Sequence, residues 1–312
     1  MRVLITGGAG FIGSHVVTAL LARGDEVVVL DDLSSGCREN LAELPARLVV
    51  GDICDEGAVR GALTGCEAVV HLAAEVSVTR SVEQPEQTQR VNDQATRELL
   101  TASQDAGVRR FVLASSCAVY GDNDREEQEE AQVPAPTSPY AVTKLAGERH
   151  VAAAAADGMG AIALRFFNVY GERQDPGSEY AAVIARFTQA MVAGEAPTVY
   201  GDGRQTRDFV HVGDVARACL LALEAAPAAW GRAFNVGRGE SISINRLLSV
   251  LGDLCEQAPG ARYEGQRPGD LRHSRASVLT ATEALGFTAA VTLEEGLRRL
   301  VGDFRERQAT TG

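Results

Sequence analysis

The fold of this chain is decided by residues 2–13, which read RVLITGGAGFIG. The apolar run before the first glycine predicts a β-strand, and a helical pattern follows the glycines. Gly7 permits a tight turn, Gly10 lets a pyrophosphate approach the backbone, and Gly13 lets the helix pack closely on the sheet. Free N–H groups and the helix dipole favour phosphate at the start of the helix. We therefore expect a dinucleotide to face Gly7, Gly10, Phe11 and Ile12.

An acidic residue closes the next apolar run. Asp31 lies eighteen residues after Gly13 and is followed by Asp32. A carboxylate at the end of the second strand accepts hydrogen bonds from the adenosine ribose and would repel a 2′-phosphate. NAD is therefore expected as the cofactor, rather than NADP.

The charge and cysteine content exclude several classes of partner. The chain has 312 residues and a net charge of −12, whereas nucleic acids and anionic membranes require a basic surface. Its six cysteines lack CxxC spacing, which is typical of reduced thiols and indicates no metal site. The start shows no secretion signal, and no apolar run approaches eighteen residues. We expect a cytoplasmic protein that binds neither nucleic acid nor membrane.

Apolar runs alternate with helical patterns through the first half of the chain. This alternation predicts an α/β fold with a Rossmann-like, doubly wound parallel sheet. Residues 1–174 are expected to form the NAD-binding domain, with some later segments returning to it. Residues 175–312 would form mostly a smaller α/β region that binds substrate. The further strands of the sheet are predicted at 48–50, 68–72, 111–114 and 161–166, and its best helices at 86–107 and 139–156.

The predicted strands become shorter after about residue 175. The acidic stretch 122–130, which precedes this change, is expected to be a solvated loop. Later strands are predicted near 198–200, 207–211 and 233–236, helices near 213–225 and 243–256, and turns over 257–275.

Tyr140 and Lys144 are the clearest candidates for catalysis. They stand four residues apart in a predicted helix and so project from one face. A phenol with the ordinary pKa of about 10 is a poor base at neutral pH, but a nearby ammonium group and a positive nicotinamide ring stabilise the phenolate. Ser116 ends a predicted strand at the sheet edge where ligands gather in this fold. The three residues predict proton transfer with a sugar hydroxyl.

Further motifs extend these features over nearly the whole chain. Together they resemble the extended short-chain dehydrogenases/reductases, and within them the NAD-dependent nucleotide-sugar epimerases and dehydratases. The similarity is greatest to UDP-glucose and UDP-N-acetylglucosamine 4-epimerases. The motifs are TGGAGFIGSH at 6–15, GDI at 51–53, HLAA at 71–74, SSCAVYG at 115–121, PYAVTK at 139–144, RFFNVYG at 165–171, GDGRQTRDFVHVGDVA at 201–216 and RPGDLRHS at 267–274.

The resemblance implies roles for individual residues. Ser116, Tyr140 and Lys144 would be the catalytic triad, and Tyr140 and Lys144 would also contact NAD. Arginines suit the phosphate-binding positions, because a planar guanidinium pairs with phosphate oxygens in a bidentate way. The other implied cofactor contacts are Asp31, Asp32, Asp52, Ile53, Leu72, Ala73 and Ala74. The implied substrate contacts are Ser116, Asn168, Val183, Tyr200, Arg207, Arg267, Asp270 and Ser274.

The two residues after Ser116 bear on the reaction. Relatives that dehydrate the sugar resemble Thr-Asp-Glu here, with two acids that move the protons of elimination, whereas this chain has Cys117 and Ala118. The resemblance therefore implies a 4-epimerase that oxidises C4 of a UDP-sugar and returns the hydride to the opposite face. A decarboxylase, a dehydrogenase or reductase, an unusual dehydratase and a dinucleotide sensor are the alternatives. A sensor would have no need of the triad.

Three positions bear on which sugar is accepted. In the resembling epimerases, a small residue at the position of Ser274 admits an N-acetyl group, which favours UDP-GlcNAc/UDP-GalNAc, UDP-Glc/UDP-Gal, or both pairs. Arg173 keeps a UDP-glucuronate 4-epimerase open, because a C6 carboxylate needs a cation. Glu172 stands where many relatives have proline.

Relatives commonly dimerise through the helices expected here at 86–107 and 139–156, so we expect a homodimer.

Overall fold

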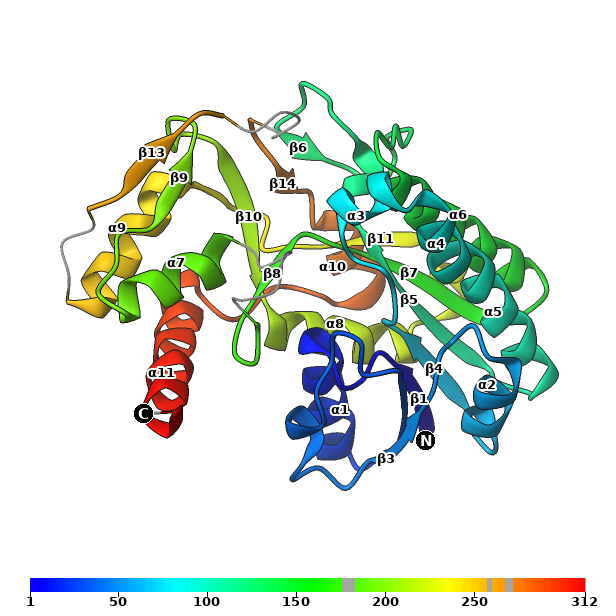
Figure 1. Ribbon diagram of the computed structural model, residues 1–312. Helices are drawn as coiled ribbons and strands as arrows, with labels where there is room; N and C mark the ends of the chain where they lie inside the picture. Colours follow the sequence, from blue (N-terminus) through cyan, green and yellow to red (C-terminus); the bar gives the residue numbers. More distant parts are fainter. Residues whose placement is uncertain (176–182, 257–259, 267–271, 312) are drawn as a thin grey trace.

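The computed structural model describes residues 1–175, 183–256, 260–266 and 272–311. Its centre is a seven-stranded sheet in the order β11-β7-β5-β4-β1-β2-β3, in which every neighbouring pair is parallel (Figure 1). The order reverses between β1 and β4, as the doubly wound prediction requires. The strands are β1 (Arg2–Thr6), β2 (Glu26–Asp31), β3 (Arg47–Val50), β4 (Ala68–His71), β5 (Arg110–Ser116), β7 (Gly160–Phe166) and β11 (Ala233–Val236).

Two helical layers cover the faces of this sheet. Val3 and Ile5 of β1 belong to the apolar core on one face, and Leu4 belongs to the core on the other. Strands that are buried on both faces must be apolar at successive positions, which accounts for the continuous apolar runs in the sequence. The first layer holds α1 (Phe11–Arg23), α8 (Val212–Glu224) and α10 (Leu279–Leu285), and the second holds α2 (Glu56–Leu63), α5 (Ala95–Asp105) and α6 (Pro139–Ala156).

A smaller C-terminal lobe has an apolar core of its own, formed by α7 (Val183–Val192), α9 (Ile244–Cys255) and α11 (Leu293–Thr311). Among the described residues, no helix is long and apolar enough to cross a bilayer. Small sheets join this lobe together and to the rest of the chain. They comprise β12 (Ser241–Ser243), β10 (Thr206–His211) and β8 (Asn168–Tyr170); β13 (Arg262–Glu264) and β9 (Thr198–Tyr200); and β14 (Arg275–Ala276) and β6 (Glu127–Gln128).

Segments from the second half of the chain complete the large sheet. β11 pairs with β7 at its edge, and α8 packs beside α1. The acidic stretch departs from the expected solvated loop, because β6 within it pairs with β14 and buries Gln128. A carboxylate oxygen of Glu130 also accepts the Asn235 N–H at 2.8 Å. Residues distant in sequence therefore hold this stretch against the body of the protein.

The helix predicted over 86–107 is interrupted. α3 (Val78–Glu83) precedes α4 (Pro85–Gln89), and a π-helical turn, Arg90–Gln94, separates α4 from α5. Within this turn, the buried Asn92 side chain donates to the Glu75 carbonyl and accepts from its N–H, both at 2.8 Å. The turn thereby satisfies the backbone of the loop that follows β4. The remaining short helices are 3₁₀ turns at Arg38–Leu41, Cys117–Tyr120 and Pro227–Ala229.

Gly13 provides a test of the packing between α1 and the first turn. A Cβ added there would lie 2.1 Å from the Gly7 carbonyl oxygen, so the backbone must shift. We expect Gly13→Ala to lower the free energy of unfolding by about 1–3 kcal/mol, measured by guanidinium denaturation. Gly61→Ala in α2 is the control, because its Cβ would meet no described atom within 4 Å. The control should gain about 0.5–1 kcal/mol, and equal effects of the two changes would contradict the argument.

Candidate active site

The turn between β1 and α1 has the form of a phosphate cradle. Gly7 has a φ of 71°, and a Cβ on it would lie 2.7 Å from the Ala73 nitrogen. A Cβ on Gly10 would meet only the Gly7 oxygen among the described atoms within 4 Å, at 3.3 Å, so space remains outside the turn. No described side chain caps α1, and its first turn holds no acidic residue. The N–H groups of Phe11 and Ile12 fit an anionic pyrophosphate.

Asp31 lies beside this cradle at the end of β2 and is only 6% exposed. Its carboxylate accepts the N–H of Ala9 at 2.8 Å and that of Leu33 at 2.9 Å. Burial raises the pKa of Asp31, and the two N–H donors act in the opposite direction. A carboxylate has more lone pairs than these two bonds use, so acceptors remain for a ribose. The other predicted cofactor residues follow the ends of β2, β3 and β4: Asp32, Asp52, Ile53, Leu72, Ala73 and Ala74.

A buried histidine links the ends of β1 and β4. His71 lies 2.6 Å from the Thr6 hydroxyl through Nδ1 and 2.8 Å from the Thr96 hydroxyl through Nε2. Thr6 also accepts the Ala73 N–H at 3.3 Å, next to the predicted cofactor path. Burial, together with the charge of Lys144, lowers the pKa of His71 to about 3. His71 is therefore neutral and adds no second positive charge beside Lys144.

The three predicted catalytic residues meet where β5 ends against α6. Ser116 is the last residue of β5, and Tyr140 lies in the first turn of α6, which the Ser138 hydroxyl caps. Lys144 follows one turn later, is 7% exposed, and donates from Nζ to the Ala114 carbonyl at 3.0 Å. Because Ala114 lies on β5, this bond ties the helix to the strand that carries Ser116.

Burial dominates the electrostatics of this group. It raises the pKa of Tyr140 to about 12, while a hydrogen bond with Ser116 lowers that pKa. Burial also lowers the pKa of Lys144 to about 8. The Lys144 Nζ lies 5.8 Å from the centroid of the Tyr140 ring and bonds the backbone instead. In the protein without NAD, burial is therefore the largest influence on the phenol pKa, and the stabilisation of the phenolate by Lys144 together with a bound nicotinamide ring stays a prediction.

A buried ion pair fixes α6 against the sheet. Glu148, one turn after Lys144, pairs with Arg165 of β7 through two hydrogen bonds of 2.9 and 2.7 Å. The Arg165 guanidinium also lies 4.8 Å from the centroid of the Tyr120 ring. Sequence reasoning missed this pair as part of the site. The available signal was the four-residue spacing of Lys144 and Glu148, which places the carboxylate on the inner face of the helix.

Two predicted substrate residues lie on neighbouring strands. Asn168 starts β8, and its amide donates to the Asp208 carbonyl of β10 at 3.0 Å, next to Arg207. The Asp208 carboxylate accepts three backbone N–H groups, and burial raises its pKa to about 6. Of the remaining candidates, Val183 begins α7, Tyr200 ends β9, and Ser274 is buried just before β14. Arg267 and Asp270 lie outside the described residues.

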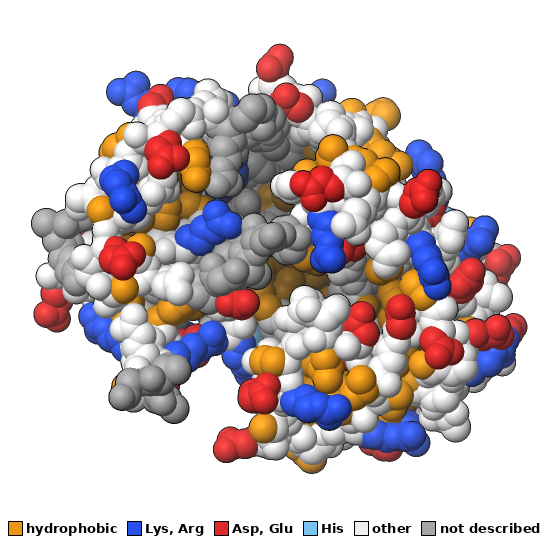
Figure 2. All heavy atoms as spheres, in the orientation of Figure 1, with side chains coloured by type: hydrophobic (Ala, Val, Ile, Leu, Met, Phe, Trp, Pro, Cys, Tyr) orange, Lys and Arg blue, Asp and Glu red, His pale blue; other side chains and the backbone are white. Residues whose placement is uncertain are grey.

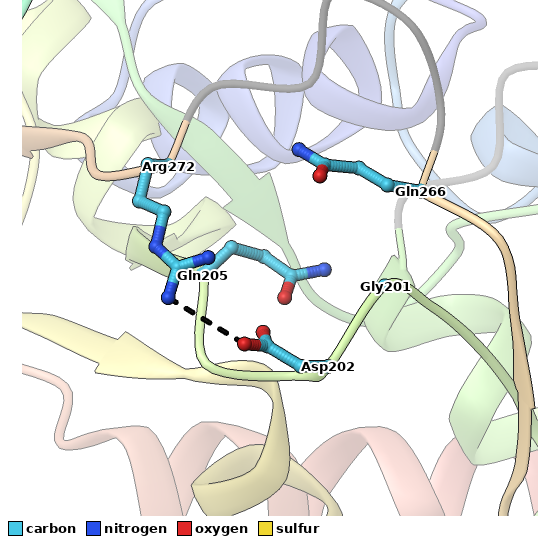
Figure 3. Close-up of a pocket in the computed structure, with 5 residues that line it drawn as sticks. All are labelled: Gly201, Asp202, Gln205, Gln266 and Arg272. Carbon is cyan, nitrogen blue, oxygen red and sulfur yellow. Dashed lines mark hydrogen bonds and ion pairs between the residues drawn. The ribbon is translucent and has the colours of Figure 1, made fainter.

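A pocket of about 160 Å³ is lined in part by residues that are close to Tyr200 and Arg207 in the sequence. Gln205 and Gln266 extend into it from opposite sides, and Arg272 pairs with Asp202 at 3.5 Å (Figure 3). The molecular surface is also hollowed between the C-terminal lobe and the part that carries the large sheet (Figure 2). Acidic and basic side chains alternate over this face, so the net charge forms no single patch there.

Arg173 contacts the cofactor half of the molecule. Its guanidinium donates to the Thr18 hydroxyl of α1 at 3.4 Å, and its N–H donates to Asp303 of α11 at 3.4 Å. Burial lowers the pKa of Arg173. The guanidinium that a sugar carboxylate would need thus contacts α1 through Nη2, whereas the bond to α11 is made by the backbone N–H.

Lys144 lies in the site at a cost in stability. Its pKa is about 8 in the folded chain and 10.5 as the ordinary value, so the unfolded chain binds more protons between these pH values and stability rises with pH there. We expect Lys144→Met to raise the free energy of unfolding of the NAD-free protein at pH 7 by about 1–3 kcal/mol. This net value includes the loss of the hydrogen bond to Ala114. Denaturation of both proteins at pH 7 and pH 10 measures this, and the gain should shrink at pH 10. A constant difference would contradict it.

Comparison with known proteins agrees with this geometry. A family model described as the NAD dependent epimerase/dehydratase family matches residues 3–237. A UDP-glucose 4-epimerase from Mycolicibacterium smegmatis is 40% identical over 98% of this chain and 99% of its own length. The crystal structure of a Thermotoga maritima UDP-glucose 4-epimerase with UDP-glucose has a TM-score of 0.93 and 39% identity, covering 99% of this chain and 100% of that one. A Methanobrevibacter ruminantium UDP-N-acetylglucosamine 4-epimerase in complex with UDP-N-acetylmuramic acid has a TM-score of 0.93 and 37% identity, covering 98% of each chain. This chain belongs to the NAD dependent epimerase/dehydratase family.

Proposed function

We propose that this protein is a UDP-sugar 4-epimerase that uses NAD as a resident cofactor. The observation that carries the proposal is the meeting of Ser116, Tyr140 and Lys144 where β5 ends against α6, with Cys117 and Ala118 following the serine. Burial raises the pKa of Cys117 to about 11, so the thiol is a poor proton donor at neutral pH. Ala118 has no acidic group. This pair argues against an elimination and supports oxidation and reduction at one carbon.

In the proposed reaction, the Tyr140 phenol exchanges a proton with the C4 hydroxyl of the sugar. Ser116 hydrogen-bonds to Tyr140 and would orient the same hydroxyl. The glycine turn and Asp31 would hold NAD, which would supply a hydride acceptor for C4 and a positive charge that favours the phenolate. Lys144 stays fixed to β5 through Ala114 and supports that charge at a distance. Return of the hydride to the other face of the keto-sugar completes the epimerisation.

The nucleotide diphosphate would lie along the C-terminal lobe. Asn168 and Arg207 on β8 and β10 would contact it, together with Val183 and Tyr200. Arg267 and Asp270 retain this role as predictions from the sequence motif. A guanidinium group gives local positive charge and paired donors in a protein of net charge −12, which is what an anionic substrate requires.

The accepted sugars are proposed to include N-acetylated ones. Ser274 is small and buried, which supports space beside the C2 substituent of the sugar. UDP-Glc/UDP-Gal and UDP-GlcNAc/UDP-GalNAc are therefore the proposed substrate pairs. The contact of Arg173 with Thr18 gives no support to a uronate substrate.

We further propose a cytoplasmic homodimer. Val78 and Val82 of α3 and Val142 of α6 are between 49% and 63% exposed, which supports a protein contact on this side. α3 and α6 pack against each other, so the valines lie on two neighbouring helices. All six cysteines are free thiols, in keeping with a reducing compartment.

The direct test is incubation of the purified protein, without added NAD, with UDP-Glc, UDP-GlcNAc and UDP-GlcA in separate reactions. Proton NMR follows the configuration at C4. We expect C4 epimers from the first two sugars. Release of water or carbon dioxide, or turnover only after NAD is supplied, would overturn the proposal.

Tyr140→Phe removes the hydroxyl that transfers the proton and leaves the ring in place. We expect kcat to fall by about 10²–10⁴-fold. The NAD content of the purified protein, measured after denaturation, should be retained. Tyr263→Phe is the matched control, because Tyr263 is 57% exposed and bonds only Asn245 among the contacts described for it. Unchanged turnover in Tyr140→Phe would exclude Tyr140 as the base.

Ser274→Tyr would fill the space proposed beside the sugar C2 group. We expect kcat/KM for UDP-GlcNAc to fall at least about tenfold more than kcat/KM for UDP-Glc, because a steric clash with one substrate raises its barrier selectively. Ser277→Tyr is the control for the bulk of the ring, because Ser277 lies at the other end of β14. Equal losses for both sugars would show that Ser274 does not distinguish them.

A further inference from the structure

One residue outside the triad connects the cofactor helix to the strands of the C-terminal lobe. Glu172 follows β8 and lies between two histidines. His15 of α1 places Nε2 2.9 Å from the Glu172 carbonyl oxygen, and His211 of β10 places Nε2 3.0 Å from its carboxylate. The His211 side chain is 2% exposed, whereas that of Glu172 is 27% exposed.

The hydrogen bonds assign the protons on both rings. Nδ1 of His211 accepts the Gly213 N–H at 3.1 Å, so it carries no hydrogen, and Nε2 must donate to Glu172. A carbonyl oxygen only accepts, so the His15 Nε2 also donates. Burial and the charge of Arg173 lower the pKa of His15 to about 4, so this ring is neutral near pH 7. The Glu172 carboxylate therefore accepts from His211, and the Glu172 backbone carbonyl accepts from His15.

The carboxylate is stabilised in its charged form at this position. Burial acts to raise the pKa of Glu172, but the His211 hydrogen bond and other contacts lower it to about 2. His211 is also the residue that caps the N-terminus of α8, where the helix dipole favours negative charge. Glu172 is thus a fixed anion between α1 and the start of α8.

The elements joined by Glu172 are those that carry the two binding regions. Its own strand, β8, begins with Asn168, and His211 ends the strand that carries Arg207. His15 lies one turn from Phe11 at the cradle, with the two ring centroids 6.0 Å apart. The next residue in the loop, Arg173, extends the contact to Thr18 of α1 and Asp303 of α11.

We propose that Glu172 is a positioning residue that holds the strands carrying Asn168 and Arg207 in place relative to the NAD-binding helix α1. Its carboxylate holds the loop after β8 to His211, and its backbone carbonyl in that loop accepts from His15 of α1. It touches neither the reacting carbon nor the triad. The proposal rests on the proposed function for the identity of the ligand that Asn168 and Arg207 bind.

Three variants test it: Glu172→Ala, Glu172→Gln, and the control Glu294→Ala, which removes an exposed ion pair of α11. The Kd for UDP is measured by calorimetry, KM and kcat with UDP-glucose, and NAD content after purification. We expect Glu172→Ala to raise Kd and KM about tenfold and to change kcat less than threefold. NAD content should be retained, because the backbone carbonyl that accepts from His15 remains. Glu172→Gln should restore all values to within about threefold of wild type, because its side-chain oxygen still accepts from His211.

A lower melting temperature in Glu172→Ala with unchanged Kd and KM would overturn the proposal, since that is the result of a merely structural role. Equal defects in Glu172→Gln would overturn it too. If Glu172→Ala does not fold, Glu172→Asp, which draws the carboxylate back by one methylene, should give the same pattern. Failure of the wild-type protein to bind UDP would contradict the proposed function instead.

Discussion

The buried ion pair between Glu148 and Arg165 is the interaction on which the arrangement of the active site depends. It joins α6 to β7, and the same helix carries Tyr140 and Lys144. A buried charge left without its partner is strongly destabilising, so neither member can move alone. Arg165 also stacks on Tyr120, whose hydroxyl donates to Asn235 of β11 at 2.6 Å. One connected set of polar groups therefore sets the position of the catalytic helix relative to two strands, β7 and β11.

The same network reaches the smaller sheets. The amide of Asn235 donates to the Gln128 carbonyl of β6 and to the Ser277 carbonyl beyond β14, at 2.8 and 3.1 Å. Buried polar groups require partners with good geometry, so this contact specifies how the acidic stretch lies on the sheet. Glu172 likewise forms hydrogen bonds to both α1 and β10. The two halves are thus joined by directional bonds as well as by apolar packing.

Much of the fold follows from local patterns. β1, the glycine turn and α1 lie where the sequence predicts them, and α6 spans the predicted residues 139–156. The interrupted helix at 85–105 could not be predicted from periodicity, because its π-helical turn depends on the bond between Asn92 and the distant Glu75. The pairing of β6 with β14 was also hidden, since an acidic stretch normally stays solvated unless a remote strand binds it.

The sequence by itself determined the sheet type, the phosphate cradle and the residue types of the triad, because these depend on short-range spacing and on the steric freedom of glycine. Only the tertiary structure decided the protonation of the site. Burial, rather than the spacing of Tyr140 and Lys144, governs both of their pKa values. It also decided that Glu172 accepts from His15 and His211, which are far from it along the chain. Desolvation and such long-range bonds arise only when the chain packs, so no local pattern records them.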